Sequence, residues 1–193
     1  MKEIQSNINI IGGGLIGAAT AYALSKLGKN VVILEQKAKF NHKRILDKRT
    51  TAISEGTKRF LDEISIWKDI SNYAEPIKKI HIVDRNQSNK IYFDNNRRKS
   101  NLGYIVKNEF ILDSLYKKLK KQNSVKIFND VSLKDIFYEG NRIITKQDNF
   151  LINTNLLIAS DGKKSSVRKI FKTPIFSKDY KKKAIVINFY HSK

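Results

Sequence analysis

Residues 7–35 constrain the fold of this chain more than any other segment. The apolar run at 8–11 predicts a buried strand, the apolar spacing over 15–27 predicts a helix, and 31–34 predict a second buried strand. Between the first strand and the helix lies the glycine pattern GxGxxG, formed by Gly12, Gly14 and Gly17. Strand, glycine turn, helix and strand in this order predict a βαβ unit with a parallel sheet.

Each part of this turn has a physical role in binding a dinucleotide. Gly12 permits the tight turn out of the strand, Gly14 lets the backbone approach a pyrophosphate, and Gly17 lets the helix pack closely on the strand. The pyrophosphate then meets the N–H groups and the positive dipole end of the helix, which begins at Leu15 and Ile16. These residues are therefore the candidate pyrophosphate site.

Glu35 closes the second predicted strand at the distance where a carboxylate accepts hydrogen bonds from an adenosine ribose. A negative charge there repels a 2′-phosphate, so NADP is disfavoured.

A secretory signal is the alternative interpretation of the N-terminal residues, because Lys2 precedes an apolar run and a small-x-small sequence. Glu3 and the glycines within that run oppose it, and it leaves residues 31–35 unexplained.

Composition limits the other chemistry that this chain can carry. It has 193 residues and no cysteine, which excludes disulfides and thiolate chemistry. The three histidines are scattered, so we expect no metal site. No apolar run approaches the ~20 residues of a membrane span. With no signal, we expect a cytoplasmic protein.

The chain is strongly basic, with a formal net charge of +20 from 38 Lys and Arg against 18 Asp and Glu. Such a charge raises the question of nucleic-acid or membrane binding. The excess is mostly lysine spread along the chain, without a nucleic-acid motif, so no specific nucleic-acid partner is expected. The clusters at 97–99 and 181–183 are interpreted as solvated faces or as peripheral contacts with the inner face of an anionic membrane.

The remaining pattern predicts alternating strands and helices. Residues 36–48 predict a long loop, Ser54 can cap a helix that ends near Trp67, and Asn108 can cap an amphipathic helix. The predicted strands cover 77–84, 90–94, 102–106, 125–128, 156–159 and 184–189, with an antiparallel meander over 132–138, 142–145 and 149–152. A basic helix is predicted over 165–171.

Residues 159–168, ASDGKKSSVR, form a second candidate site at the end of the strand 156–159. Taken alone, a turn with an N-cap explains them, with Asp161 or Ser165 capping the helix and Gly162 at positive φ. Together with residues 7–35, they resemble the D-G-x-x-S-x-V-R motif of class A flavoprotein monooxygenases, the para-hydroxybenzoate hydroxylase-like family. The resemblance implies that Asp161 and Gly162 lie at the riboflavin part of FAD, and that NAD(P)H is the external reductant.

Residues in the middle of the chain indicate which branch of this family the chain resembles. Residues 47–54, 76–84 and 103–112 are similar to the ubiquinone-biosynthesis hydroxylase branch, which hydroxylates a polyprenylated phenol. The resemblance implies that Arg49 lies along FAD and that Asn108 faces its ribityl or pyrophosphate region. Without the family, Arg49 is an ordinary exposed cation. Since the flavin performs the oxygen chemistry in such enzymes, we expect no catalytic side chain.

The resemblance also implies an α/β fold that is divided into two units. Residues 1–76 and 102–175 would form a Rossmann-like FAD-binding domain with a parallel sheet and an antiparallel β-meander crossover. Residues 77–101 and 176–193 would be the beginning of a substrate-domain sheet whose remainder is absent. We therefore expect the N-terminal half of a truncated or split hydroxylase, with a separately encoded C-terminal half as a candidate partner.

Two other function classes remain compatible with parts of the sequence. An NAD-dependent oxidoreductase or NAD-binding domain shares the features of residues 7–35 and would prefer NAD to FAD. A non-enzymatic basic module would bind nucleic acid or membrane with steep salt dependence and no nucleotide preference.

Overall fold

A six-stranded sheet forms the centre of the computed structural model, which describes residues 1–36, 49–83, 90–95, 101–183 and 185. The strand order is β8-β2-β1-β11-β10-β9. The parallel part contains β1 (Lys2–Ile11), β2 (Val31–Glu35), β8 (Val125–Asn129) and β11 (Phe150–Ala159), and the antiparallel part adds β10 (Arg142–Lys146) and β9 (Asp135–Glu139). The expected α/β class with a parallel sheet and an antiparallel meander is confirmed.

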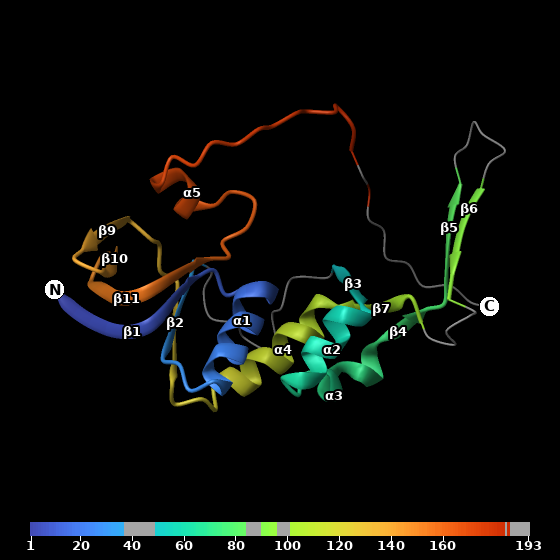
Figure 1. The fold of residues 1–193 in the computed structure, drawn as a ribbon, viewed down its shortest axis with the longest axis horizontal. Helices are drawn as coiled ribbons and strands as arrows, with labels where there is room; N and C mark the ends of the chain where they lie inside the picture. The colour runs from blue at the N-terminus through green and yellow to red at the C-terminus, as the bar shows by residue number, and fades with distance from the viewer. Residues whose placement is uncertain (37–48, 84–89, 96–100, 184, 186–193) are drawn as a thin grey trace.

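Helices cover both faces of this sheet because the buried strands are apolar on both sides. Ile8 and Ile10 pack with α1 (Leu15–Lys26) and α4 (Asn108–Leu119), whereas Ile11 packs on the opposite face with Val167 of α5 (Ser166–Ile170). The strand β1 is therefore held between two apolar clusters, and the glycine turn follows directly at its end (Figure 1).

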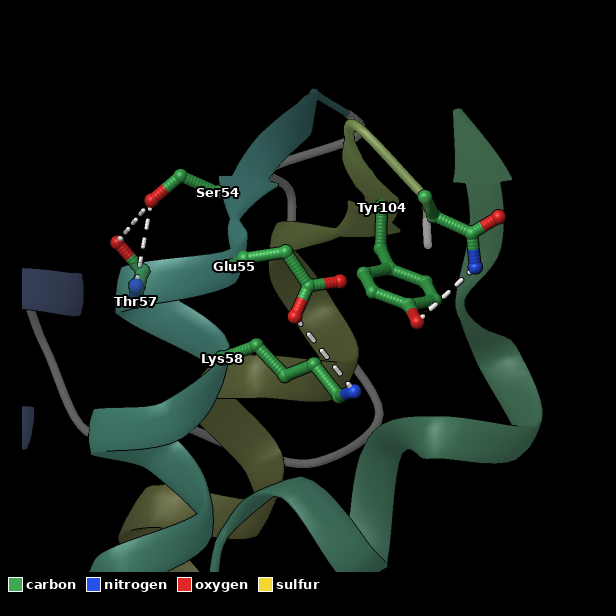
Figure 2. Close-up of polar contacts among 6 residues, drawn as sticks. Ser54, Glu55, Thr57, Lys58 and Tyr104 are labelled. Atoms are coloured by element: carbon green, nitrogen blue, oxygen red, sulfur yellow. Dashed lines mark hydrogen bonds and ion pairs between the residues drawn. The ribbon is translucent and has the colours of Figure 1, made fainter. Parts of the chain in front are cut away.

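A smaller antiparallel sheet carries the order β3-β7-β4, from Thr50–Ser54, Gly103–Lys107 and Glu75–Ile77. Between β3 and β4 run α2 (Glu55–Glu63), α3 (Trp67–Ile70) and the 3-10 turn η1 (Ser71–Tyr73). Ser54 caps α2 as predicted, because its hydroxyl accepts a hydrogen bond from the Thr57 N–H at 3.2 Å (Figure 2). Lys58 pairs with Glu55 at 3.8 Å and lies 5.2 Å from the ring centre of Tyr104, which ties α2 to β7.

A two-stranded hairpin stands apart from both sheets (Figure 1). Its strands are β5 (Lys79–Val83) and β6 (Lys90–Asp94), which pair antiparallel as predicted. Every residue of both strands is exposed.

Four details differ from the sequence-based expectations. The helix that starts after Ser54 ends at Glu63, because Ser65 turns the chain at a φ of 61° before α3 begins. The strands predicted at 149–152 and 156–159 are one continuous strand, β11. Lys107, and not Asn108, is the N-cap of α4. The short strands β3 and β4 were not predicted as such.

Several predictions lie outside the described residues. These are the loop over 36–48 apart from Gln36, the basic cluster at 97–99 and the strand over 184–189 apart from Ile185.

Candidate cofactor-binding site

The turn between β1 and α1 has the geometry that a dinucleotide pyrophosphate needs. Gly12 has a φ of 100°, and a Cβ there would lie 2.5 Å from the Ser160 carbonyl oxygen. A Cβ on Gly17 would overlap the Gly12 carbonyl oxygen, so α1 packs against the turn only because this residue is glycine. A Cβ added to Gly14 would meet no atom within 4 Å, which leaves open space where a phosphate must approach.

Gly14 is also the N-cap of α1, and no side chain caps this helix end. The first N–H groups of the helix, at Leu15 and Ile16, therefore have no side-chain acceptor among the residues that the structure describes. The Ile16 side chain is 72% exposed beside them. An uncapped helix N-terminus next to open space can bind an anion.

Glu35 lies directly against this turn. Its Oε2 accepts a hydrogen bond from the Gly13 N–H at 2.7 Å, and its side chain is buried. Gly13 was not among the predicted site residues, although it links the carboxylate to the loop. The predicted contact of Glu35 with a ribose stays a prediction.

Tyr116 of α4 contacts the same turn, although no sequence motif marks it. Its hydroxyl donates a hydrogen bond to the Gly13 carbonyl at 2.8 Å. Burial, followed by the negative charge of Glu35, raises the pKa of the Tyr116 hydroxyl. The hydroxyl therefore keeps its proton and acts as a donor.

The end of β11 meets the glycine turn through Ser160. Its single Oγ–H lies within hydrogen-bond distance of the Ile11 carbonyl at 3.0 Å and of the Gly12 carbonyl at 2.9 Å, so the two carbonyls share this donor. An open pocket of about 320 Å³ lies here, lined by Ile16, Ala159, Ser160, Asp161, Gly162, Ser165 and Arg168. The structure thus brings the two predicted motifs, which are separated by almost 150 residues, to one place.

Asp161 has a structural role as well as a position in this pocket. Its Oδ2 accepts hydrogen bonds from the Ser166 N–H at 2.6 Å, the Ser166 hydroxyl at 2.9 Å and the Val167 N–H at 3.3 Å. Burial raises the pKa of Asp161, but the hydrogen bonds from Ser165, Ser166 and Val167 outweigh it, so the pKa is lowered. Gly162 follows with a φ of 78°. Asp161 is therefore a charged anchor for α5 that also lines the pocket.

Arg49 and Asn108 lie together but do not line this pocket. The Asn108 N–H donates to the Arg49 carbonyl at 2.9 Å, and the buried Asn108 side chain accepts from the Thr51 hydroxyl at 2.5 Å. The Arg49 side chain is exposed. The predicted contacts of these two residues with FAD stay predictions.

Two further properties of the described residues bear on function. None of their His, Cys, Asp and Glu side chains gather into a group of three that could hold a metal ion. None of their helices has the length and apolarity required to cross a bilayer.

Comparison with known protein families identifies the family of this chain. Residues 5–192 match the family model of the FAD binding domain. The chain belongs to the FAD binding domain family. The glycine turn described above thus lies within an FAD binding domain.

Curated relatives of this FAD binding domain include proteins whose names contain ubiquinone. The mitochondrial ubiquinone biosynthesis monooxygenase COQ6 of Drosophila melanogaster is 28% identical over 93% of this chain and 40% of its own length. The ubiquinone hydroxylase UbiL of Rhodospirillum rubrum is 24% identical over 97% of this chain and 44% of its own length. The chain therefore spans less than half the length of these relatives.

Solved structures show the same fold. The p-nitrophenol 4-monooxygenase PnpA of Pseudomonas putida superposes with a TM-score of 0.75 at 20% identity, over 89% of this chain and 44% of that protein. PqsL of Pseudomonas aeruginosa, described as a probable FAD-dependent monooxygenase, gives a TM-score of 0.76 at 15% identity, over 91% of this chain and 48% of that protein. At such identities the similarity extends to the fold alone.

Proposed function

We propose that this chain binds FAD across the ends of β1, β2 and β11. The pyrophosphate would lie over Gly14 and the first N–H groups of α1, the adenosine ribose at Glu35, and the riboflavin part toward Asp161 and Gly162. One observation carries this proposal: Ser160 bonds the Gly12 carbonyl, so the pocket beside Asp161 opens directly next to the pyrophosphate turn.

FAD, when bound, supplies the redox chemistry that activates oxygen. The residues of this chain bind and orient it. The Glu35 carboxylate can accept hydrogen bonds from the ribose hydroxyls. The positive end of the α1 dipole favours the negatively charged pyrophosphate. In this proposal Asn108, at the start of α4, and Arg49, which immediately precedes β3, contact the cofactor. The Asn108 side chain is held by the Thr51 hydroxyl.

The reaction that we propose is hydroxylation of the aromatic ring of a polyprenylated phenol in ubiquinone biosynthesis, with NAD(P)H as external reductant. The names of the relatives from Drosophila and Rhodospirillum support this substrate class. The reductant rests on the resemblance of residues 159–168 to the flavoprotein monooxygenase motif.

We propose further that residues 77–101 and 176–193 belong to a substrate-binding unit, and residues 1–76 and 102–175 to the FAD-binding unit. The hairpin β5–β6 supports this division. Ile82 and Phe93 are each 49% exposed and Tyr92 is 59% exposed, so the hairpin has apolar surface to cover. A two-stranded hairpin is marginally stable by itself, so its partner would be further polypeptide, including a separately encoded C-terminal half.

A peripheral membrane contact would suit a polyprenylated substrate. Residues 171–183 are all exposed and combine the lysines 181–183 with Phe176, which is 94% exposed, and Tyr180, which is 72% exposed. Basic and aromatic side chains together favour the surface of an anionic bilayer.

Calorimetric titration of the folded chain with FAD, and in parallel with NAD, tests the cofactor proposal. We expect FAD to bind more tightly, and Glu35→Ala to weaken it by about tenfold through loss of the ribose hydrogen bonds and of the bond that holds the Gly13 N–H. Glu139→Ala removes an exposed carboxylate from β9 and serves as the matched control. Preferred binding of NAD would replace the monooxygenase proposal with the NAD-binding alternative.

A further inference from the structure

The glycine turn is held at two successive carbonyls by side chains from distant parts of the chain. Ser160 donates to the carbonyl of Gly12, and Tyr116 donates to the carbonyl of Gly13. Tyr116 lies on α4, which packs against α1, and it is only 3% exposed. Its hydroxyl thus reaches the turn from the protein interior.

The planarity of the peptide group gives these two hydrogen bonds a directional effect. In a trans peptide, the C=O and the N–H point in opposite directions. The peptide between Gly12 and Gly13 is fixed at both ends, by Ser160 at its carbonyl and by Glu35 at its N–H. The next peptide is fixed by Tyr116 at the Gly13 carbonyl, so the N–H of Gly14 is directed away from Tyr116.

Gly13 and Gly14 have different surroundings. Gly13 is buried between Tyr116 and Glu35, whereas Gly14 is half-buried beside open space, where an added Cβ would meet no atom within 4 Å. The turn therefore leaves room for an anion beside Gly14, on the side where this residue is not enclosed by Tyr116 and Glu35. A free glycine turn would sample other peptide orientations, because glycine has no Cβ to restrict them.

We propose that Tyr116 is a positioning residue for the cofactor pyrophosphate. By fixing the peptide between Gly13 and Gly14, its hydroxyl preorganises the Gly14 N–H as a donor to the pyrophosphate. This inference rests on the proposed binding of FAD at the same turn.

The test compares Tyr116→Phe with the wild-type chain by calorimetry, using FAD, ADP and adenosine as probes. We expect FAD and ADP, which share the pyrophosphate, to bind about tenfold more weakly, because the turn must be ordered during binding. Adenosine binding should be unchanged, since adenosine carries no phosphate. Tyr22→Phe removes a hydroxyl from the same apolar cluster and is the matched control, with unchanged affinities expected.

A second readout follows the backbone itself. In ¹⁵N NMR spectra, the Gly14 amide of the wild-type chain should shift strongly when ADP is added, and in Tyr116→Phe this shift should be reduced. Should Tyr116→Phe fail to fold, the wild-type spectrum decides, because a Gly14 amide that is insensitive to ADP overturns the inference.

The possible failures are distinguishable. Equal affinity of Tyr116→Phe and wild type for ADP overturns the positioning role and leaves FAD binding intact. Equal losses for adenosine and ADP also overturn it, because they would indicate a general structural effect. A folded wild-type chain that binds neither FAD nor ADP overturns the proposed function itself, and the inference with it.

Discussion

Asn9 of β1 donates a 2.7 Å hydrogen bond from its Nδ2 to the Oγ1 of Thr145 on β10, and both side chains are fully buried. The strand β11 lies between these two strands, so the bond links the parallel part of the sheet to the antiparallel part across an intervening strand. Gln147 donates to the same Thr145 oxygen at 3.2 Å. A single hydroxyl thus serves two buried amide groups.

Removing this hydroxyl should destabilise the sheet. Thr145→Val keeps the shape but leaves two buried donors without their acceptor, at a cost of about 1–3 kcal/mol in the free energy of unfolding. Urea denaturation measures the change. Thr173→Val, at an exposed position, should leave the unfolding free energy nearly unchanged. A neutral effect of Thr145→Val would contradict the proposed importance of this buried network.

Substitution by alanine should lower FAD affinity at Gly17 and should raise stability at Gly56. Gly17→Ala places a methyl group onto the Gly12 carbonyl oxygen, so the turn and α1 must move apart and FAD affinity should fall by more than about tenfold. At Gly56, in α2, the nearest atom to a new Cβ is 3.8 Å away. Gly56→Ala should therefore stabilise the chain by about 0.5–1 kcal/mol through helix propensity. Thermal unfolding and FAD titration of the two variants check both expectations.

Asp161 should make stability depend on pH in the acidic range. Its pKa is lowered in the folded chain, so its stabilising effect is present above the ordinary value of 3.8 and is lost as the pH falls through the folded-state pKa. Asp161→Asn cannot accept the same charge-assisted bonds. The difference in unfolding free energy between wild type and Asp161→Asn should therefore be constant above about pH 5 and shrink as the pH falls below 3.8.

Asp62→Asn, at an exposed residue of α2, measures the background change that removal of a surface carboxylate causes over the same pH range. A change for Asp161→Asn that does not exceed this background would show that the charge of Asp161 does not hold α5.

The basic and aromatic segment 171–183 predicts binding to anionic vesicles. Vesicles with about 30% anionic lipid should sediment the chain at about 0.1 M salt and release most of it at about 0.5 M salt. Replacing the lysines at 181–183 by glutamine should weaken this binding severalfold. The matched control replaces three other exposed lysines, Lys2, Lys29 and Lys78. Equal losses in both triple variants would indicate attraction by net charge alone.

Local patterns in the sequence predicted the elements, whereas the contacts between them required the fold. The βαβ unit was predictable because its strand, turn and helix signals lie within residues 7–35. Tyr116 and Ser160 were not identified as partners of the glycine turn, because they lie 103 and 148 residues from the carbonyls that they bind. Tyr116 also continues the apolar face of α4, where it resembles an ordinary core residue.

The strand β11 illustrates how polar residues can be mistaken for a strand end. Asn153 and Asn155 lie between the two short strands that were predicted, and both side chains accept hydrogen bonds from Arg142 of β10, at 2.5 and 2.6 Å. A cross-strand partner thus stabilises polar residues that would otherwise favour a turn. The positive φ of Ser65, which divides α2 from α3, has no local glycine to signal it.

The pairing of β1 with β11 determines when the site can form during synthesis. Residues 2–11 leave the ribosome long before residues 150–159, which form one of their two neighbouring strands in the sheet. Contacts between such distant segments form late in folding because a long loop must close. The hydrogen bonds between Ser160 and the glycine turn can therefore form only after Ser160 has left the exit tunnel. A nascent chain arrested before that point should lack the finished turn, even though the whole βαβ unit has already been translated.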